Sequence, residues 1–471
     1  MKGLKKVTIA FMLFLCGLVF VGCGNETTTT TTTQQKLATP TNFTISTNGV
    51  ASWDAVEGAL RYRLNFVNNE TNASIKRVSE ETSIEIASLD LPEAVYNVFI
   101  QAVGNGTESD YTAEPVTYEV LPEQAKQVLE GEELIDGLYV KWLGRNEYDS
   151  SKKLNMMYHS ASSFEFKAVG SEVNVELFAT RYSMANSRPY IVVMVDDDYE
   201  NRVRIGLEQE YTTLNIGQYA PNDGLLHTYS VYKSTESTDS HIGLKKIQTN
   251  GELIQEVVYK DRLIEFIAAS SSTGYGNLVI GGTKTSANSD CMSAFSYLTA
   301  RALNADINIY SASGWGVKAS QWTSPNSLNL YDAYKKIDFY STKDWDFTQI
   351  TPDVIVINLG TNDWSYINQA TDANVRAQRV EDFKNQYVDF LNFLHQVYPN
   401  TQIIMFYGLM NETNIYGYTE EIYQTAKETI PTLEIIQVQG DGRGAASHPS
   451  KESHAQVAEL LIAKVKSVMG W

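Results

Sequence analysis

The sequence predicts a multidomain protein in which two β-sandwiches precede an α/β domain with a parallel sheet. At 471 residues the chain is longer than one ordinary domain. Strand-type alternation runs from about residue 36 to residue 260, whereas short apolar runs alternate with helical periods from Arg262 onward. A hydrophobic content of 43% and an aromatic content of 11% suit packed, β-rich domains rather than disorder.

The chain is acidic, with a formal net charge of −19 at pH 7. Binding to nucleic acid requires a basic face, so the charge argues against that class of partner. An uncharged glycan is compatible with an acidic protein, although the charge does not itself indicate one.

The first residues form a basic segment followed by an apolar one. Lys2, Lys5 and Lys6 precede an apolar run over residues 7–20, and Cys23 follows shortly afterwards. This arrangement resembles a bacterial lipoprotein signal, which implies that Cys23 is lipidated and that the protein faces outward from the bacterial cell membrane. The alternative is a plain transmembrane anchor, but the run is shorter than the roughly 20 residues that a span needs.

Cysteine usage predicts no disulfide in the mature chain. Of the three cysteines, Cys16 leaves with the signal peptide, Cys23 carries the lipid and Cys291 is left alone. Since Cys291 lies in an apolar stretch, we interpret it as a buried small hydrophobe rather than a nucleophile.

Residues 24–35 form a threonine-rich linker. The segment includes an unbroken threonine run over residues 27–33, followed by Gln34 and Gln35. Such a sequence offers nothing to bury, so we expect a solvated spacer.

Residues 36–121 predict the first β-sandwich. Alternating strand patterns cover the segment, and its length fits a seven-stranded sandwich. It resembles a fibronectin type III module at Pro40, Trp53, Tyr62, Leu89 and the YNVFIQAVG stretch. Such modules commonly act as spacers, and a sugar-binding role is the alternative.

Residues 135–260 predict the second β-sandwich, with residues 122–134 as a linker before it. Alternating or apolar runs occur at residues 164–166, 173–177 and 190–195, without a long helical period. The pattern is typical of a jelly roll.

An acidic triplet, Asp196-Asp197-Asp198, follows one of these runs. It resembles a metal cluster at first sight, but an acidic triplet directly after a strand is more typical of a hairpin turn. We predict the turn.

Residues 261–471 predict the α/β domain. Helical spacing of apolar residues recurs at Val380, Phe383, Tyr387, Phe390, Leu391 and Leu394. Five apolar runs predict strands at residues 263–267, 307–310, 354–359, 403–407 and 433–438. Because strands and helices alternate, the sheet is expected to be parallel, with ligands at the carboxyl ends of its strands.

Four residues with catalytic potential fall at or after those ends: Ser270, Gly314, Asn362 and His448. A serine hydroxyl needs a base within hydrogen-bond reach to act as a nucleophile, and His448 is the candidate. Attack on an ester creates an oxyanion, which the Ser270 N–H, the Gly314 N–H and the Asn362 amide could stabilise. Each residue alone could be an ordinary loop or turn residue, but their order after successive strands favours a hydrolase site.

These blocks resemble those of the SGNH hydrolases, also called the GDSL type, whose catalytic domain is flavodoxin-like. The resemblance extends over residues 135–471 to carbohydrate esterase family two, which joins a jelly roll to an SGNH domain. The matching stretches are WLGR at 142–145, VYKSTE at 231–236, IEFI at 264–267, GYG at 274–276 and HPS at 448–450. The resemblance implies removal of O-acetyl groups from polysaccharides such as acetylxylan, without metal or organic cofactor. It also implies that Ser270 is the nucleophile, His448 the base, and Ser270, Gly314 and Asn362 the oxyanion donors.

Two departures from the family pattern bear on activity. Ala268 and Ala269 stand where the family has Gly-Asp before the serine, and Ala445 and Ala446 stand where its acid precedes the histidine. Loss of the acid costs about 10⁴-fold in a well-studied protease. Asp441 could replace it only if its loop folds back, whereas some related esterases use a Ser-His dyad with a backbone carbonyl orienting the ring. We expect reduced, dyad-type activity.

Aromatic residues beside the blocks are candidates for substrate contact. Trp315 and Trp364 each follow a site residue, and Tyr275 is a weaker third. Indole faces stack on sugar rings, although these rings could merely wall the pocket. The remaining histidines show no metal-ligand spacing, so we expect no metal site; they are His159, His227, His241, His395 and His454.

The sequence therefore predicts a surface lipoprotein esterase acting on an acetylated polysaccharide or oligosaccharide. The alternative is a catalytically impaired, glycan-binding relative that uses the same cleft. A third possibility, an adhesion protein led by the fibronectin-like module, leaves the catalytic blocks unexplained.

Overall fold

The computed structural model divides the chain into two compact units, Met1–Pro122 and Glu123–Trp471. It describes residues 36–46, 49–89, 91–92, 94–120, 126–322 and 329–471. The predicted signal peptide, Cys23 and the threonine-rich linker lie outside the described residues. No helix in the described part is both long enough and apolar enough to cross a membrane.

The first unit consists of two antiparallel sheets around one core. One sheet has the order β1-β2-β5 and the other the order β4-β3-β6-β7. The strands are β1 (Thr44–Ile45), β2 (Val50–Ser52), β3 (Arg61–Asn68), β4 (Ser74–Ser79), β5 (Ser83–Glu85), β6 (Ala94–Val103) and β7 (Val116–Val120), with a short helix η1 (Ile86–Leu89). Trp53 and Tyr62 meet edge to face in the core, with ring centroids 5.2 Å apart. Alternating strand residues thus fill a sandwich core, as the pattern predicts.

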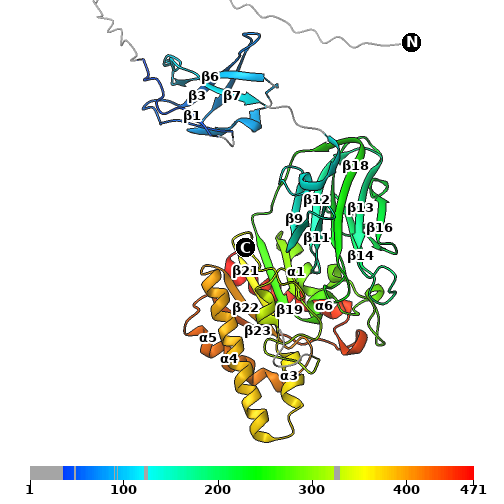
Figure 1. The fold of residues 1–471 in the computed structure, drawn as a ribbon. Helices are drawn as coiled ribbons and strands as arrows, with labels where there is room; N and C mark the ends of the chain where they lie inside the picture. The colour runs from blue at the N-terminus through cyan, green and yellow to red at the C-terminus, as the bar shows by residue number, and fades with distance from the viewer. Residues whose placement is uncertain (1–35, 47–48, 90, 93, 121–125, 323–328) are drawn as a thin grey trace, which may run out of the picture. The chain divides into compact units, whose positions relative to one another are not determined.

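The second unit begins with a larger β-sandwich (Figure 1). An extended antiparallel sheet folds over a shared core, in which Phe166 of β12 and Val175 of β13 are buried. Its strands are β8 (Lys126–Glu130), β9 (Val140–Leu143), β10 (Asn146–Asp149), β11 (Leu154–Met157), β12 (Ser163–Val169), β13 (Val173–Ala179), β14 (Tyr190–Val195), β15 (Val203–Gly206), β16 (Tyr211–Asn215), β17 (Leu226–Lys233) and β18 (Ile242–Ile254). Two short helices accompany them, η2 (Gly131–Leu134) and η3 (Gly217–Tyr219).

This sandwich starts earlier than the sequence indicates. Strand β8 lies within the predicted linker over residues 122–134 and pairs with β18, where Leu129 faces Ile247. Leu129 and Leu134 are fully buried in the core. The strand escapes prediction because its few apolar residues stand among charged ones, so that its stability comes from pairing with β18 rather than from its own pattern.

The acidic triplet forms the predicted turn between β14 and β15. Asp196 and Asp197 have φ angles of 51° and 57°, and Asp198 accepts a hydrogen bond from the Asn201 side chain. Asp196 accepts the Thr228 N–H at 2.9 Å. The Asp196 and Asp198 carboxylates are therefore bound to their own turn and its neighbouring strand.

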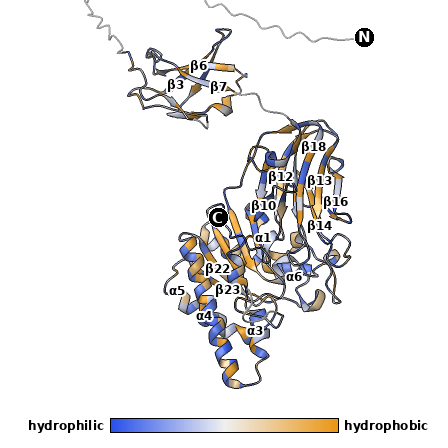
Figure 2. Cartoon of the chain, in the orientation of Figure 1, coloured by the Kyte–Doolittle hydropathy of each residue, from blue (hydrophilic) through white to orange (hydrophobic). Residues whose placement is uncertain are grey.

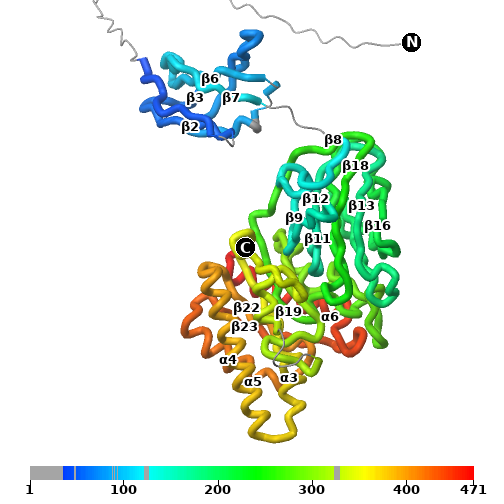
Figure 3. The backbone as a smooth tube through the Cα atoms, in the orientation of Figure 1, coloured from blue at the N-terminus to red at the C-terminus, as the bar shows by residue number. Residues whose placement is uncertain are grey.

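The rest of the second unit is an α/β fold with the strand order β20-β19-β21-β22-β23, every neighbouring pair parallel. The tube in Figure 3 follows the chain from the sandwich into this part. The predicted parallel sheet is confirmed, each strand to within one residue at either end: β19 (Leu263–Ala268), β20 (Asp306–Ser311), β21 (Val354–Asn358), β22 (Gln402–Tyr407) and β23 (Leu433–Gln437). The helices are α1 (Phe295–Ala302), α2 (Leu330–Tyr334), α3 (Thr361–Asn368), α4 (Ala373–Val397), α5 (Tyr416–Lys427) and α6 (Lys451–Met469). The short helices are η4 (Ser270–Thr273), η5 (Ser286–Asn288), η6 (Cys291–Ser293), η7 (Thr413–Ile415) and η8 (Ala445–Ser447).

Helices cover both faces of the parallel sheet, and its strands are correspondingly apolar (Figure 2). On one face Ile267 and Ile355 pack with Phe383 of α4, while on the other Phe266 packs with Phe295 of α1. Successive residues of a strand point to opposite faces, so an unbroken apolar run fills both cores. The helical spacing in α4 is confirmed, because all six apolar residues that predict it are buried.

The sandwich is joined to the α/β part by buried charged side chains. Arg145 is 0% exposed and donates to the Tyr334 and Lys336 carbonyls at 2.5 Å each. Its guanidinium lies over the rings of Tyr310 and Tyr334, 4.2 and 4.3 Å from their centroids. An arginine of the sandwich thus completes an aromatic core of the neighbouring fold.

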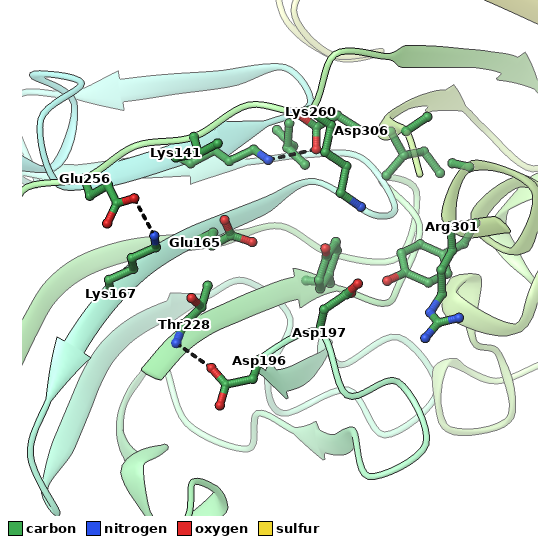
Figure 4. A pocket seen from close by; sticks show the side chains of 17 residues that line it. Lys141, Glu165, Lys167, Asp196, Asp197, Thr228, Glu256, Lys260, Arg301 and Asp306 are labelled. Carbon is green, nitrogen blue, oxygen red and sulfur yellow. Dashed lines mark hydrogen bonds and ion pairs between the residues drawn. The ribbon is translucent and has the colours of Figure 1, made fainter. Parts of the chain in front are cut away.

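A second ionic contact lies beside a cavity of about 630 Å³ (Figure 4). Lys141 of β9 and Asp306 of β20 pair at 2.8 Å, each side chain 5% exposed. Lys167 pairs with Glu256 at 2.8 Å on the sandwich side. None of the predicted catalytic residues lines this cavity, so we assign it to the contact between the two folds.

Candidate active site

The four predicted catalytic residues line one cleft of about 740 Å³ at the carboxyl edge of the parallel sheet. Ser270 begins η4 directly after β19, and Gly314 follows β20 by three residues. Asn362 is the second residue of α3, after β21, while His448 lies between η8 and α6. The strand order changes direction beside β19, which is where open parallel sheets form ligand sites.

Ser270 and His448 are in hydrogen-bond contact, with Oγ 2.7 Å from Nε2. The other ring nitrogen, Nδ1, lies 3.2 Å from the carbonyl oxygens of both Ala445 and Ala446. Because a carbonyl can only accept, Nδ1 carries the proton. Nε2 is then free to accept the Ser270 hydroxyl proton, which is the tautomer that a general base requires.

The backbone before His448 is bent so that its carbonyls point at the ring. Ala446 and Ser447 have φ angles of 49° and 60°, which L residues seldom adopt. Ala445 is fully buried against Gly276, where an added Cβ would lie 2.2 Å from the Ala445 Cβ. Asp441 accepts instead from Ser450 and from the Arg443 N–H. Its carboxylate therefore does not replace the missing acid.

Burial lowers the pKa of His448 below its ordinary value, although the carbonyls of Ala446 and Ala445 act in the opposite direction. The ring is further held by Tyr275, whose ring stacks on it at 4.0 Å between centroids and 22° between planes. Tyr275 also lines the cleft. Its stacking on the His448 ring would orient that ring if His448 acts as the base.

Two of the predicted oxyanion donors, Gly314 and Asn362, are positioned by a loop over residues 312–319, here called the oxyanion loop. Gly314 has a φ of 80°, which favours glycine. Asn362 donates one Nδ2 hydrogen to the Trp315 carbonyl at 2.9 Å, leaving its second amide hydrogen for an oxyanion. The neighbouring Asp363 is buried and accepts the Val317, Lys318 and Ala319 N–H groups at 3.0, 2.8 and 3.3 Å.

The alanines before Ser270 leave the nucleophile turn intact. Neither Ala268 nor Ala269 has a positive φ, so this turn does not require glycine. Serine hydroxyls link this turn to its neighbours. Ser271 donates to Asn358 at 2.7 Å, and Ser272 lies 2.7 Å from the Ser311 hydroxyl. Both contacts tie the turn to the neighbouring strands β21 and β20.

The aromatic candidates divide between cleft and core. Trp364 lines the cleft, whereas Trp315 does not. The Trp315 ring packs against Phe339, with centroids 4.7 Å apart, because the oxyanion loop turns that side chain toward the apolar core. Trp322 lines the cleft instead and is 65% exposed. Its ring lies 3.4 Å from where a Gly314 Cβ would stand.

Sequence reasoning missed Trp322 and Asp363 as site residues. Trp322 stands eight residues after Gly314 in a Ser/Pro-containing stretch, and an exposed indole in such a loop is the available signal. Asp363 has no distinguishing sequence signal, because the adjacent Asn362 is the residue that the motif marks as an oxyanion donor.

No group of three or more histidine, cysteine or carboxylate side chains with metal-binding geometry occurs among the described residues. Cys291 is buried, as the sequence predicts. Burial raises the pKa of its thiol to about 12, so it is not a nucleophile at neutral pH.

Sequence comparison finds similarity to plant-polysaccharide enzymes. A cellulase/esterase of Acetivibrio thermocellus is 29% identical over 263 residues, covering 52% of this chain and 30% of that protein. Two proteins of Cellvibrio japonicus are named acetylxylan esterase / glucomannan deacetylase. One is 22% identical to this chain over an alignment that covers 71% of this chain and 90% of the relative. The other is 32% identical over an alignment that covers 45% of this chain and 61% of the relative. The chain thus spans less than two thirds of two of these relatives. No family model matches it.

Solved structures share the fold of the second unit. An acetyl xylan esterase from Butyrivibrio proteoclasticus superposes with a TM-score of 0.64 at 21% identity, covering 74% of this chain and all of that one. A family two carbohydrate esterase from Clostridium thermocellum, in complex with cellohexaose, superposes with a TM-score of 0.62 at 24% identity. The superposition covers 70% of this chain and 99% of that one. The named relatives are carboxylic ester hydrolases, and this chain has the fold of family two carbohydrate esterases, a jelly roll joined to an SGNH-type domain.

Proposed function

We propose that this protein is a carboxylic ester hydrolase that removes O-acetyl groups from a polysaccharide or oligosaccharide by a Ser-His dyad. The observation that carries the proposal is the 2.7 Å contact between Ser270 Oγ and a His448 ring whose Nδ1 faces two backbone carbonyls. The names of the relatives support the substrate class.

In the first half-reaction, Ser270 Oγ attacks the acetyl carbonyl carbon while His448 Nε2 takes the hydroxyl proton. The negative charge on the carbonyl oxygen is stabilised by the Gly314 and Ser270 N–H groups and the free Asn362 amide hydrogen. His448 then returns the proton to the departing sugar hydroxyl, leaving an acetyl-serine.

In the second half-reaction, His448 takes a proton from water as the water oxygen attacks the acetyl carbon. The bond between that carbon and Ser270 Oγ then breaks, His448 returns the proton to Ser270, and acetate leaves. The imidazolium that forms in each step is stabilised by the Ala445 and Ala446 carbonyl dipoles rather than by a carboxylate. Dipoles stabilise a cation less than a full charge does, so we expect a slower enzyme than one with a complete triad.

Two exposed features of the cleft suit a carbohydrate. Trp322 and Trp364 offer indole faces near the nucleophile, and amide side chains at Gln321, Asn368 and Gln369 offer hydrogen-bond partners for hydroxyl groups. We also propose that the first unit is fibronectin type III-like and that the catalytic domain is flavodoxin-like. The strand order with β19 between β20 and β21 supports the second.

One observation favours a second candidate, a glycan-binding protein without turnover. No carboxylate in the described part of the chain makes a hydrogen bond to His448. The aryl-acetate assay below separates the two candidates.

The test is acetate release from an aryl acetate by a chain of residues 36–471, with Ser270→Ala as its matched control. We expect turnover that falls by up to about 10⁶-fold in the variant, because the nucleophile is lost, while its melting temperature stays unchanged. Acetylated xylan and glucomannan are the next substrates. Equal rates in both proteins, together with retention on immobilised glycan, would favour the binding protein.

We also propose that the protein is anchored on the outer face of a bacterial membrane through a lipid on Cys23, supported by the basic and apolar pattern of residues 1–23. Incorporation of labelled fatty acid into the intact protein, and its loss in Cys23→Ser, tests this anchor.

A further inference from the structure

A carboxylate of the β-sandwich reaches the oxyanion loop. Glu236 lies between β17 and β18, in a segment over residues 234–241 that we call the docking loop. Its Oε2 accepts the Ser313 N–H at 3.1 Å, and its side chain is 2% exposed. Ser313 directly precedes Gly314, so this contact lies next to the backbone that presents a proposed oxyanion donor.

The docking loop is itself held in place. The Lys233 ammonium is fully buried and donates to the Thr235 and Glu236 carbonyls at 2.6 and 3.1 Å. Ser234 donates to Asp290 at 3.0 Å, and Ser237 donates to Asp338. The loop is therefore a rigid support.

The Glu236 carboxylate is neutralised locally. Its Oε1 pairs with Lys284 at 2.9 Å, and Lys284 also pairs with Asp239. Burial acts to raise the pKa of Glu236, but the Lys284 ammonium and the Ser313 contact outweigh it and the pKa is lowered. Glu236 is thus ionised at neutral pH, and a charged acceptor binds an N–H more strongly than a neutral one.

The oxyanion loop is consequently clamped at both ends. Glu236 holds Ser313 at its start, and Asp363 holds Val317, Lys318 and Ala319 at its end. Glycine at position 314 gives the intervening backbone a wide choice of conformations. Without the first contact, only the far end of the loop would be fixed by an acidic side chain.

We infer that Glu236 is a positioning residue of the proposed esterase site, which holds the oxyanion loop through Ser313 so that the Gly314 N–H stays aimed at the developing oxyanion. The inference rests on the proposed function and deepens it, because it makes the β-sandwich part of the catalytic apparatus. The contact by which the carboxylate positions the loop is its hydrogen bond with the Ser313 N–H; its charge also acts to raise the pKa of His448.

The experiment compares Glu236→Ala and Glu236→Gln with the wild-type protein, using Lys141→Met as the matched control. Lys141 forms another buried ionic contact between sandwich and sheet, so its loss weakens the same interface without touching the cleft. Kinetics on an aryl acetate are combined with hydrogen exchange of the peptide that spans residues 311–319, followed by mass spectrometry.

We expect Glu236→Ala to lower kcat by about 10- to 100-fold, as misplacement of a catalytic group does, with little change in KM because an oxyanion contact is made in the transition state. Glu236→Gln keeps an acceptor for Ser313 and should recover most of kcat. The backbone amides of the oxyanion loop should exchange faster in Glu236→Ala than in the wild-type protein, Glu236→Gln or Lys141→Met. Lys141→Met should lower the melting temperature, while its kcat stays at the wild-type value.

Three results would overturn the inference: unchanged loop exchange in Glu236→Ala, an equal loss of kcat in Lys141→Met, or no recovery in Glu236→Gln. If the wild-type protein hydrolyses no ester, the proposed function fails. Hydrogen exchange then still decides whether Glu236 holds the loop.

Discussion

At the scale of single residues, the arrangement around His448 would orient the proposed base without an acid. Two carbonyl oxygens 3.2 Å from Nδ1 fix the tautomer, and the stacked Tyr275 ring fixes the plane. The left-handed backbone at Ala446 and Ser447 costs about 1–2 kcal/mol per residue. We interpret this strain as the structural requirement for turning the carbonyls toward the ring.

The lowered pKa of His448 predicts the acid limb of the pH profile. Only the neutral imidazole accepts the Ser270 proton, so activity is present above the pKa of the folded protein and is lost as the pH falls through it. We expect the acid limb of kcat/KM to lie below pH 6.5, the ordinary value for histidine. Asp441→Asn should leave that limb in place. A limb at or above pH 6.5, or one that moves in Asp441→Asn, contradicts this account.

At the scale of elements, the junctions after β19, β20 and β21 each supply one part of the site, and polar side chains tie them together. Asp363 of α3 is the main tie to the oxyanion loop, through three backbone N–H groups. A buried carboxylate that receives several such bonds is expensive to remove, because each donor loses its only partner.

Asp363→Ala is therefore expected to lower the free energy of unfolding by about 3–5 kcal/mol and to reduce kcat. The free energy of unfolding of Asp363→Asn should lie between those of the wild-type protein and Asp363→Ala, because the asparagine amide retains one acceptor oxygen. Urea denaturation measures the free energy. A loss below about 1 kcal/mol in the alanine variant would mean that water replaces the carboxylate at no cost.

Elements with a periodic apolar pattern were predictable from the sequence, whereas those that depend on long-range contacts were not. Strands such as β19 and helix α4 were predictable because a buried element repeats its apolar residues at the period of its own geometry. Strand β8 was not, since its pairing with β18 is a long-range contact. Whether Trp315 and Trp322 face the core or the cleft depends on the path of the oxyanion loop. The hydrogen bonds from His448 Nδ1 to backbone carbonyls depend on the dihedral angles before it. Neither feature produces a periodic pattern in the sequence.

At the scale of the whole molecule, the second unit behaves as one structure because side chains of the sandwich enter the α/β part. Arg145 is the largest of the fully buried side chains. Its guanidinium lies 3.9 Å from Glu265, which also accepts from Tyr334 at 2.6 Å. Removing one member of such a pair leaves the other charge buried and uncompensated.

Arg145→Met should consequently destabilise the protein by about 3–5 kcal/mol, and the double variant Arg145→Met/Glu265→Gln should recover part of that loss. Burial already raises the pKa of Glu265, so its neutral replacement is tolerated more readily than a stranded carboxylate. Calorimetry of the two variants measures the difference. A double variant as unstable as the single one would show that packing, rather than charge, is what Arg145 supplies.

The buried Cys291 has a practical consequence. A chain of residues 36–471 contains this cysteine and no other, and its pKa of about 12 leaves it unreactive toward alkylating probes near neutral pH. A second cysteine placed at the exposed Thr413 position, beside the cleft residue Glu412, would then be the single site for a fluorophore or spin label. Sugar occupancy of the cleft becomes an optical or magnetic readout, independent of turnover.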